Sequence, residues 1–373
     1  MSVAPPAPAE TDGGAPSPSG GRADGTPPRS DRALHRSFFL RRLLILPFSL
    51  FLVLAISFLL VALLPESTAE QIAGVGASPE RVAEVRADLG IDRPLLEQFG
   101  SYVGGLLQGD LGTSFYNNES VLGQMIDRLP ATLELVVPGF AAALLIGIGT
   151  GTLAAYFARR APDRFVQWLT TATQSVPEFV LALLAIYFLT YKLGWLPAPI
   201  GRLDFNGVPP PDVTGLYTVD AVLAGQWGTF RDAVLHLVLP VLTIGVSLAV
   251  LFSRVTRASM GDALQGSHIE YARSLGLPEH QVLRYAFIES RTPLLTFAAI
   301  CAALLVGGSA IVESIFSFQG LGQWGLESVT TLDPPNVRGY VLLTATVTLV
   351  AFFLLDLVSA RLDPRITFGK GRG

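Results

Sequence analysis

Charged residues are scarce in this chain of 373 residues. Asp, Glu, Lys and Arg make up 15% of the sequence, whereas hydrophobic residues make up 50%. A typical soluble domain contains about 25% charged residues. The composition therefore excludes an ordinary soluble globular protein and indicates a membrane protein with several spans. The net charge of −4 adds little, because the charges are segregated along the chain.

Cysteine and histidine are also nearly absent. The single cysteine, Cys301, lies inside an apolar run, so an intrachain disulfide is excluded and redox chemistry is not expected. The four histidines show no H-E-x-x-H spacing and predict no metal site; they are His35, His236, His268 and His280. No serine lies in a recognisable protease pattern. We therefore do not expect an enzyme.

A phosphate-binding loop is missing as well. The pattern G-x-x-x-x-G-K-[ST] occurs nowhere, and Gly369-Lys370-Gly371 lacks all of its upstream residues. If ATP drives this protein, another chain must bind it. We accordingly expect no cofactor in this chain and no nucleic-acid partner.

Long apolar runs occupy much of the remaining sequence. The first follows Arg41-Arg42, and as a helix Leu43–Leu64 covers about 33 Å, enough to cross a bilayer core of about 30 Å. Five further spans are predicted, within Leu135–Phe157, Val166–Leu193, Ala233–Phe252, Leu294–Ile311 and Val341–Val358. The sequence therefore predicts an all-α, polytopic membrane protein with six transmembrane helices.

Two features of the spans bear on packing and function. Small-residue patches, Gly147-Ile148-Gly149 and Gly307-Gly308-Ser309-Ala310, are typical of seams where helices approach closely. The third span is interrupted by Pro177 and Glu178. A carboxylate within a span is costly and usually faces a cavity or a partner. Glu178 is therefore a candidate for the translocation path, and a structural hydrogen-bonding role for it stays equally open.

The segments between the spans differ in character. Residues 65–131 hold two amphipathic helical patterns, one starting at Ser78-Pro79-Glu80 and one following Pro94, and predict a small helical domain. The amino-terminal tail is rich in Pro, Gly, Ala and Ser, so we expect disorder there. The predicted organisation is a disordered tail at 1–37, a first span at 38–64, the helical domain at 65–131, a five-span core at 132–366 with a polar loop at 254–293, and a short tail at 367–373.

Lys and Arg are distributed unequally between the two sides of the predicted membrane. Placing the amino terminus inside gives the inner segments more than twice as many basic residues as the outer ones. Because basic residues favour the cytoplasmic side, both termini and the 254–293 loop are predicted to be cytoplasmic, and the 65–131 domain extracytoplasmic.

The most informative polar stretch is SHIEYARSLGLPEHQVLRYAFIESRTP, residues 267–293. Ser267 and Glu270 fit a capping box that starts a helix. Gly276 fits the left-handed position that ends it, and Pro278 fits the first turn of a second helix. The stretch therefore predicts a helix-turn-helix hairpin at the cytoplasmic face, where a partner outside the bilayer can hold it.

The same residues carry a family resemblance. Glu270, Ala272 and Gly276 match the E-x-A-x-x-x-G core of the "EAA" loop of ABC-importer permeases. Tyr271 replaces the second Ala, and Pro293 lies further downstream than in the general pattern; both departures resemble the dipeptide/oligopeptide branch. The resemblance extends from about residue 38 to 366 through the strings SPERVAEVRADLGIDRPLLEQ, GDLGTSF, LPATLEL, SVPEF and IFSFQGLGQWG, in which Gln319 replaces the usual proline.

This resemblance implies a function and a set of partners. The chain would be half of the translocation path of an ATP-driven peptide importer in a bacterial or archaeal inner membrane. Its partners would be a second permease of similar fold, ABC ATPase subunits that bind the ATP, an extracytoplasmic substrate-binding protein and the lipid bilayer. The residues implied in docking to the ATPase are Glu270, Tyr271, Ala272, Gly276 and Leu277.

Two alternatives stay open from the sequence. The same machinery could import another cargo, such as a nickel chelate, glutathione or an oligosaccharide. A self-sufficient secondary transporter is the other, and that class predicts several intramembrane charges and paired broken helices.

Overall fold

The computed structural model describes residues 47–59, 78–88 and 93–362, and the regular elements in these residues are all helices. The predicted tails, 1–37 and 367–373, lie outside the described residues, as do both ends of the first predicted span. The described part of that span, Pro47–Leu59, is an apolar helix. The all-helical class predicted from the sequence is confirmed.

Several helices are long and apolar enough to cross a membrane. Within the described residues there are four: α5 (Val121–Tyr156), α9 (Trp227–Leu264), α11 (Glu279–Gly308) and α14 (Pro334–Leu362). A bent pair adds a fifth if it counts as one span; it consists of α6 (Ala161–Gln174) and α7 (Glu178–Ala185) continued by the π-helix η1 (Ile186–Lys192), with a bend of 98°. The bend falls at the predicted Pro177 interruption, where proline cannot continue a helix ladder.

The long helices extend beyond the predicted apolar cores. α5 begins at Val121 rather than Leu135, and the Ser120 hydroxyl caps it by accepting a hydrogen bond from the Gly123 N–H at 3.4 Å. The apolar pattern locates the part of a helix that lipid surrounds. It does not reveal polar first turns, which are stabilised by a capping residue and by packing. α5 consequently runs across the predicted domain boundary at residue 131.

The centre of the molecule is the packing of α5 against α9. A Cβ added at Gly147 would lie 2.8 Å from the Ala249 carbonyl oxygen, and one at Gly151 would lie 2.6 Å from that of Ser253. The backbones therefore touch at these glycines, as the small-residue pattern predicts. At Gly149, Gly307 and Gly308 an added Cβ would meet nothing within 4 Å in the described part of the chain. Those three glycines are therefore not points of close helix contact among the described residues, whereas Ala310 of the second patch is one, because a Cβ added at Gly322 would lie 2.7 Å from its Cα.

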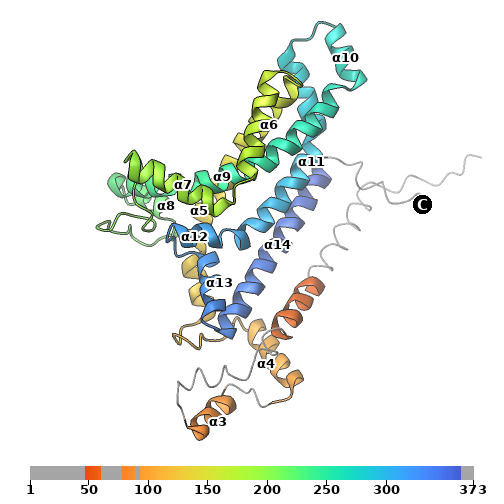
Figure 1. Cartoon of the computed structure of the whole chain (residues 1–373). Helices are drawn as coiled ribbons and strands as arrows, with labels where there is room; N and C mark the ends of the chain where they lie inside the picture. Colours follow the sequence, from red (N-terminus) through yellow and green to blue (C-terminus); the bar gives the residue numbers. More distant parts are fainter. Residues whose placement is uncertain (1–46, 60–77, 89–92, 363–373) are drawn as a thin grey trace, which may run out of the picture.

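The shorter helices gather at the two ends of the long ones (Figure 1). One end carries α10 (Ser267–Ser274), whereas the opposite end carries α3 (Pro79–Asp88), α4 (Leu95–Leu107) and α13 (Leu321–Thr330). α8 (Tyr217–Leu223) and α12 (Ala310–Ile315) complete the set. The hairpin and the predicted outer helices thus lie at opposite ends.

α4 is attached to the first helix by aromatic side chains. The Phe99 ring lies 5.3 Å from that of Phe58 and 5.8 Å from that of Phe51, both edge to face. The guanidinium of Arg338, on α14, lies 5.1 Å from the centroid of Phe58. The amphipathic pattern after Pro94 therefore corresponds to a real helix whose apolar face packs on the first helix and α14.

Candidate functional site

The hairpin begins differently from its prediction. α10 starts at Ser267, but its cap residue is Gly266, and no side chain caps the helix. The predicted capping box between Ser267 and Glu270 is wrong, because Ser267 is already the first helical residue and Gly266 holds the extended cap conformation. Glu270 is exposed in the first turn, where a negative charge suits the positive end of the helix dipole.

The turn of the hairpin is as predicted. Gly276 has φ +74°. Its N–H donates to the Arg273 carbonyl at 2.9 Å, and the Leu277 N–H donates to the Ala272 carbonyl at 3.3 Å. These two bonds form a Schellman motif, the standard way to end a helix on a left-handed glycine. The direction in which the chain leaves α10 therefore depends on the backbone at Gly276.

The second helix of the hairpin is continuous with a membrane span. Pro278 is the N-cap of α11 rather than a residue of its first turn, and the helix then runs through Pro293 to Gly308. The sequence placed the hairpin and the fifth span in separate helices divided at Pro293, and the structure joins them. Arg273 and Glu279 close the turn with an exposed ion pair at 3.3 Å.

One face of the hairpin is buried against the long helices. Ile269 and the half-buried Leu277 pack into a cluster built from the ends of α5 and α9 and the start of α11; its other buried members are Ala155, Met260, Ala263, Val282 and Ala286. Ala272 is also buried. It is therefore inaccessible to a partner, and its small size serves packing within this chain.

The other face of the hairpin is open. Tyr271 is 65% exposed and Leu275 is 61% exposed, and their i, i+4 spacing places them on one side of the helix. Of the predicted docking residues, Glu270, Tyr271 and Gly276 are accessible and Ala272 is not. Leu275 was missed by sequence reasoning, although its spacing from Tyr271 was visible.

An ion pair between a buried carboxylate and a partly exposed arginine fixes the same end of the molecule. Asp163, in the first turn of α6, accepts hydrogen bonds from Arg257 of α9, from Nε at 2.7 Å and from Nη2 at 3.0 Å. The Arg159 N–H and the Gln167 side chain also donate to Asp163, each at 2.8 Å. Sequence reasoning missed this contact, which ties α6 to α9 next to the hairpin.

Glu178 is half-buried at the start of α7, directly after the bend. Its carboxylate makes no hydrogen bond or ion pair with any described residue, and it lines neither of the two pockets described below. The structure therefore places it at the break that the sequence predicted and leaves both proposed roles as hypotheses.

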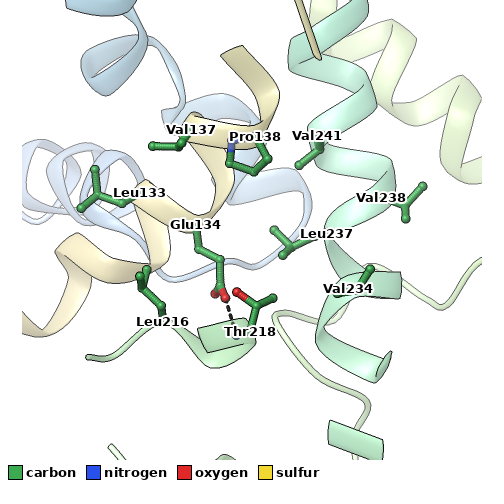
Figure 2. Close-up of a pocket in the computed structure, with 10 residues that line it drawn as sticks. All are labelled: Leu133, Glu134, Val137, Pro138, Leu216, Thr218, Val234, Leu237, Val238 and Val241. Atoms are coloured by element: carbon green, nitrogen blue, oxygen red, sulfur yellow. Dashed lines mark hydrogen bonds between the residues drawn. The ribbon is translucent and has the colours of Figure 1, made fainter. Parts of the chain in front are cut away.

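An apolar pocket of about 560 Å³ lies at the opposite end from the hairpin, between α5, α8 and α9. Figure 2 shows the Glu134 carboxylate on its wall, directed toward Thr218, whose N–H donates to it at 2.6 Å. The remaining wall is apolar and comes from Leu133, Val137, Pro138, Leu216, Val234, Leu237, Val238 and Val241.

Glu134 also holds Arg202, whose Nε donates to it at 3.0 Å and whose Nη2 forms a second, very short contact. The Arg202 guanidinium lies 3.5 Å from the Tyr217 ring centroid, and Nη2 also donates to the Gly215 carbonyl at 2.8 Å. A buried ion pair is stable only when hydrogen bonds satisfy the remaining polar atoms. Here they do, so the guanidinium is held rigidly.

Asp220 supports this arrangement from the adjoining loop. Its carboxylate accepts from the backbone N–H groups of Thr214 at 3.0 Å and Gly215 at 2.9 Å, and from the Thr214 hydroxyl at 2.8 Å. Burial acts to raise the pKa of Asp220, but these hydrogen bonds outweigh it and hold the pKa below its ordinary value. Asp220 therefore fixes the loop whose Gly215 carbonyl binds Arg202.

Arg202 is shared with a second, polar pocket of about 470 Å³ between α5 and α13. Its charged and amide side chains are Asp127, Arg128, Arg202, Gln319, Gln323 and Glu327. Sequence reasoning missed this pocket, because its walls come from segments far apart in the chain. The string LPATLEL contained Glu134, but that residue stood just before the predicted span and was not counted as an intramembrane acid.

Glu313 builds the wall behind the polar pocket. It is fully buried and accepts from the hydroxyls of Thr132 and Ser309, both at 2.8 Å, and from the Gln323 N–H at 2.9 Å. A Cβ at Gly320 would lie 2.7 Å from the Glu313 carboxylate. The Gly-Leu-Gly string therefore wraps closely around Glu313, and Glu313 anchors the start of α13.

The loop before that string has an unusual backbone. Gln319 has φ +50° and Ser317 has φ +54°. Proline fixes φ near −65°. A proline in place of Gln319, as in the usual form of this string, could therefore not adopt the turn seen here.

The long apolar helices indicate that this chain is an integral membrane protein. Comparison with protein families identifies which kind. Residues 147–368 match the model described as binding-protein-dependent transport system inner membrane component, and residues 35–136 match the model for the N-terminal part of such membrane components. The chain belongs to this family.

Individual relatives agree over most of the chain. A dipeptide transport system permease protein of Alkalihalophilus pseudofirmus is 31% identical over 89% of this chain and 99% of its own length. A probable D,D-dipeptide transport system permease protein of Escherichia coli is 36% identical over 86% of this chain and 94% of its own length. A glutathione transport system permease protein of Pectobacterium atrosepticum is 33% identical over 89% of this chain and 99% of its own length.

The resemblance predicted from the hairpin is thus confirmed. The chain is a permease subunit of an ABC importer and not an enzyme. Membership of a binding-protein-dependent system implies an ATPase and a substrate-binding protein as partners.

Proposed function

We propose that this permease imports dipeptides or oligopeptides and that its hairpin couples it to the ATPase. The observation that carries the coupling proposal is the hairpin itself, which is fixed on one face and leaves Tyr271 and Leu275 exposed on the other. Large apolar side chains exposed together on a polar hairpin are typical of a protein-binding surface. The names of the relatives support the peptide cargo.

The continuity of α11 gives the coupling a mechanical route. The helix has 30 residues, which corresponds to about 45 Å, and it begins at the hairpin turn. Movement of the ATPase against α10 would therefore tilt a single rod that passes into the membrane. ATP hydrolysis belongs to the ATPase subunits, and alternating access belongs to the permease.

The proposed orientation places both termini and the hairpin in the cytoplasm of a bacterial or archaeal cell, with the chain in the inner membrane. The excess of Lys and Arg in the hairpin-side segments supports it. The full proposal has six spans and a small extracytoplasmic domain at 65–131. The position of α3 and α4 opposite the hairpin supports that arrangement (Figure 1).

A second permease subunit of similar fold completes the proposed path. Only 6% of the apolar window of α14 is buried within this chain, and 28% of that of α11. Such faces require lipid or another helix, and two permeases meeting along them would enclose a path that one chain does not.

Other cargoes remain alternatives under the same mechanism. The relatives include a glutathione permease, and nickel chelates or oligosaccharides would be carried by the same machinery. The family assignment excludes the alternative of a self-sufficient secondary transporter. That class would contain several acids within its helices, and the structure does place Glu134 and Glu313 inside helices in addition to Glu178. Both of those carboxylates are engaged in internal contacts.

Reconstitution tests this proposal. The permease, its partner permease, the ATPases and the binding protein are placed in proteoliposomes with ATP at the ATPase face, and uptake of a labelled dipeptide is measured. We expect uptake that requires ATP and is lost with a hydrolysis-deficient ATPase. ATP-dependent uptake of labelled glutathione or of a nickel chelate, with no uptake of the dipeptide, would contradict the peptide assignment.

A further inference from the structure

The polar pocket between α5 and α13 holds charged side chains of both signs. Arg128 on α5 is half-buried and has no acidic partner among the described residues; its Nη1 donates only to the Gln124 carbonyl, at 3.2 Å. Glu327 on α13 is exposed on the facing wall and accepts from Gln323 at 2.8 Å. Asp127 adds a second acid.

We infer that this pocket binds the charged ends of a short peptide, with Arg128 at the carboxylate and Glu327 at the ammonium group. The inference rests on the proposed peptide cargo and assigns a site to it. A guanidinium binds a carboxylate through strong, charge-assisted hydrogen bonds. Arg128 has most of its donors free for such bonds, whereas Arg202 is largely neutralised by Glu134.

The pocket has the size and the fixed geometry that a small ligand needs. Its volume of about 470 Å³ lies within the range of about 300–1,000 Å³ for small-molecule sites. Three of its walls are fixed by buried contacts. Glu134 holds Arg202, Glu313 holds the backbone of Gln323, and Gln124 accepts from the Trp324 indole at 3.0 Å. A fixed site loses less entropy on binding.

The position of the pocket agrees with this role. Its residues come from segments that the proposed topology places outside, at the end of the molecule opposite the hairpin (Figure 1). A peptide released by the binding protein arrives from that side. The apolar pocket of Figure 2 adjoins this one through the Glu134–Arg202 pair, because Glu134 lines the apolar pocket and Arg202 lines the polar one. It offers room for an apolar side chain of the same peptide.

The experiment compares modified peptides across charge-neutralising variants of the complete importer in proteoliposomes. Uptake of a dipeptide with free termini is compared with uptake of its C-terminal amide and its N-acetyl derivative, each at concentrations that saturate the binding protein. The variants are Arg128→Gln and Glu327→Gln. The matched controls are Arg231→Gln and Glu97→Gln, which change exposed residues outside the pocket. The ratio of uptake of the free peptide to uptake of the modified peptide is measured for the parent and for each variant. Because all of them use the same binding protein, its own selectivity cancels when the ratio of a variant is compared with that of the parent.

In the parent, we expect uptake of the free peptide to exceed uptake of the amide. In Arg128→Gln the ratio of these two uptakes should fall about tenfold, which corresponds to the loss of one strong charged contact. Glu327→Gln should instead remove the preference over the N-acetyl peptide. Neither control should alter either ratio. Co-purification with the ATPase and unchanged basal ATP hydrolysis show that each variant is assembled, and either variant alone suffices for the test.

Three results would overturn the inference. Unchanged ratios in both variants would mean that the pocket does not contact the peptide ends. Equal loss for every peptide, together with weaker binding of the substrate-binding protein, would make the pocket a docking surface for that protein. If the parent takes up no peptide at all, the proposed cargo fails and this site assignment fails with it, whereas the first two results leave the cargo standing.

Discussion

Replacing Gly276 tests whether the turn of the hairpin aims it at the ATPase. The change is Gly276→Val, with Gly276→Asn as its matched control. Both substitutions add a side chain at φ +74°, and an added Cβ meets nothing within 4 Å in the described part of the chain. A clash of the added Cβ with the described part of this chain is therefore excluded, and the effect expected within the chain is the cost of the left-handed backbone. Asn adopts that conformation several-fold more readily than most residues, and β-branched Val poorly.

The expected magnitude follows from that cost. A side-chain-bearing residue in the left-handed region costs about 1–2 kcal/mol. The Schellman bonds from Gly276 and Leu277 are worth about 0.5–1.5 kcal/mol each, so strain of this size is enough to open the turn and re-aim α10 against α11. At about 1.4 kcal/mol for each factor of ten, the ATPase should bind the Val variant about 5- to 30-fold more weakly. The Asn variant should bind nearly as the parent does.

The measurement is co-purification of the ATPase with each variant, followed by transport-coupled ATP hydrolysis. The membrane part should still assemble, because the long helices pack on one another independently of the turn. Parent-like ATPase binding by Gly276→Val would refute the coupling role of the hairpin. Equal failure of the Val and Asn variants would show that bulk at the docking surface, not backbone strain, is responsible.

Three further predictions concern topology and buried acids. In a Cys301→Ser background, an impermeant thiol reagent applied to intact cells should label a cysteine at Ser78 and not one at Ser267; the reverse pattern would invert the proposed topology. Glu178→Gln should lower uptake with assembly intact if Glu178 lines the path, or lower the thermal stability of the complex if it is a structural partner. A stable variant with normal uptake would exclude both roles. Glu313→Ala leaves two buried hydroxyl donors, of Thr132 and Ser309, without their acceptor, at about 1–3 kcal/mol each, together with the part-buried Gln323 N–H. It should lower the melting temperature far more than Glu313→Gln, which keeps an acceptor; equal melting temperatures would contradict the anchoring role.

The features predicted correctly from the sequence are those specified locally. The turn at Gly276 depends on one glycine and the residues beside it, and the break at Pro177 depends on one missing N–H. Both are therefore visible in a few consecutive letters. The cap of α10 is equally local, yet it was misplaced by one residue, because Gly and Ser are both acceptable cap residues and they stand next to each other at Gly266 and Ser267.

The features that the sequence did not reveal depend on partners distant in the chain. Glu134 and Arg202 are 68 residues apart, and Thr132 and Glu313 are 181 residues apart. Each of these residues taken alone is an ordinary polar residue at the edge of an apolar run, and its role appears only when the packing of the helices brings the pair together. The polar pocket escaped prediction for the same reason.

The two proposed sites are joined by one continuous stretch of structure. α11 starts at the Gly276 turn and ends at Gly308, and the next residue, Ser309, donates to Glu313. Glu313 in turn holds the backbone of Gln323, which lines the polar pocket. A tilt of α11 large enough to break the hydrogen bond from Trp324 on α13 to Gln124 on α5 would displace the α13 wall of that pocket relative to Arg128. Because packed helices shift between discrete arrangements rather than deform continuously, such a tilt would separate the two charges that we assign to the ends of the peptide. Release of the peptide into the path would then follow from the same movement that the ATPase drives.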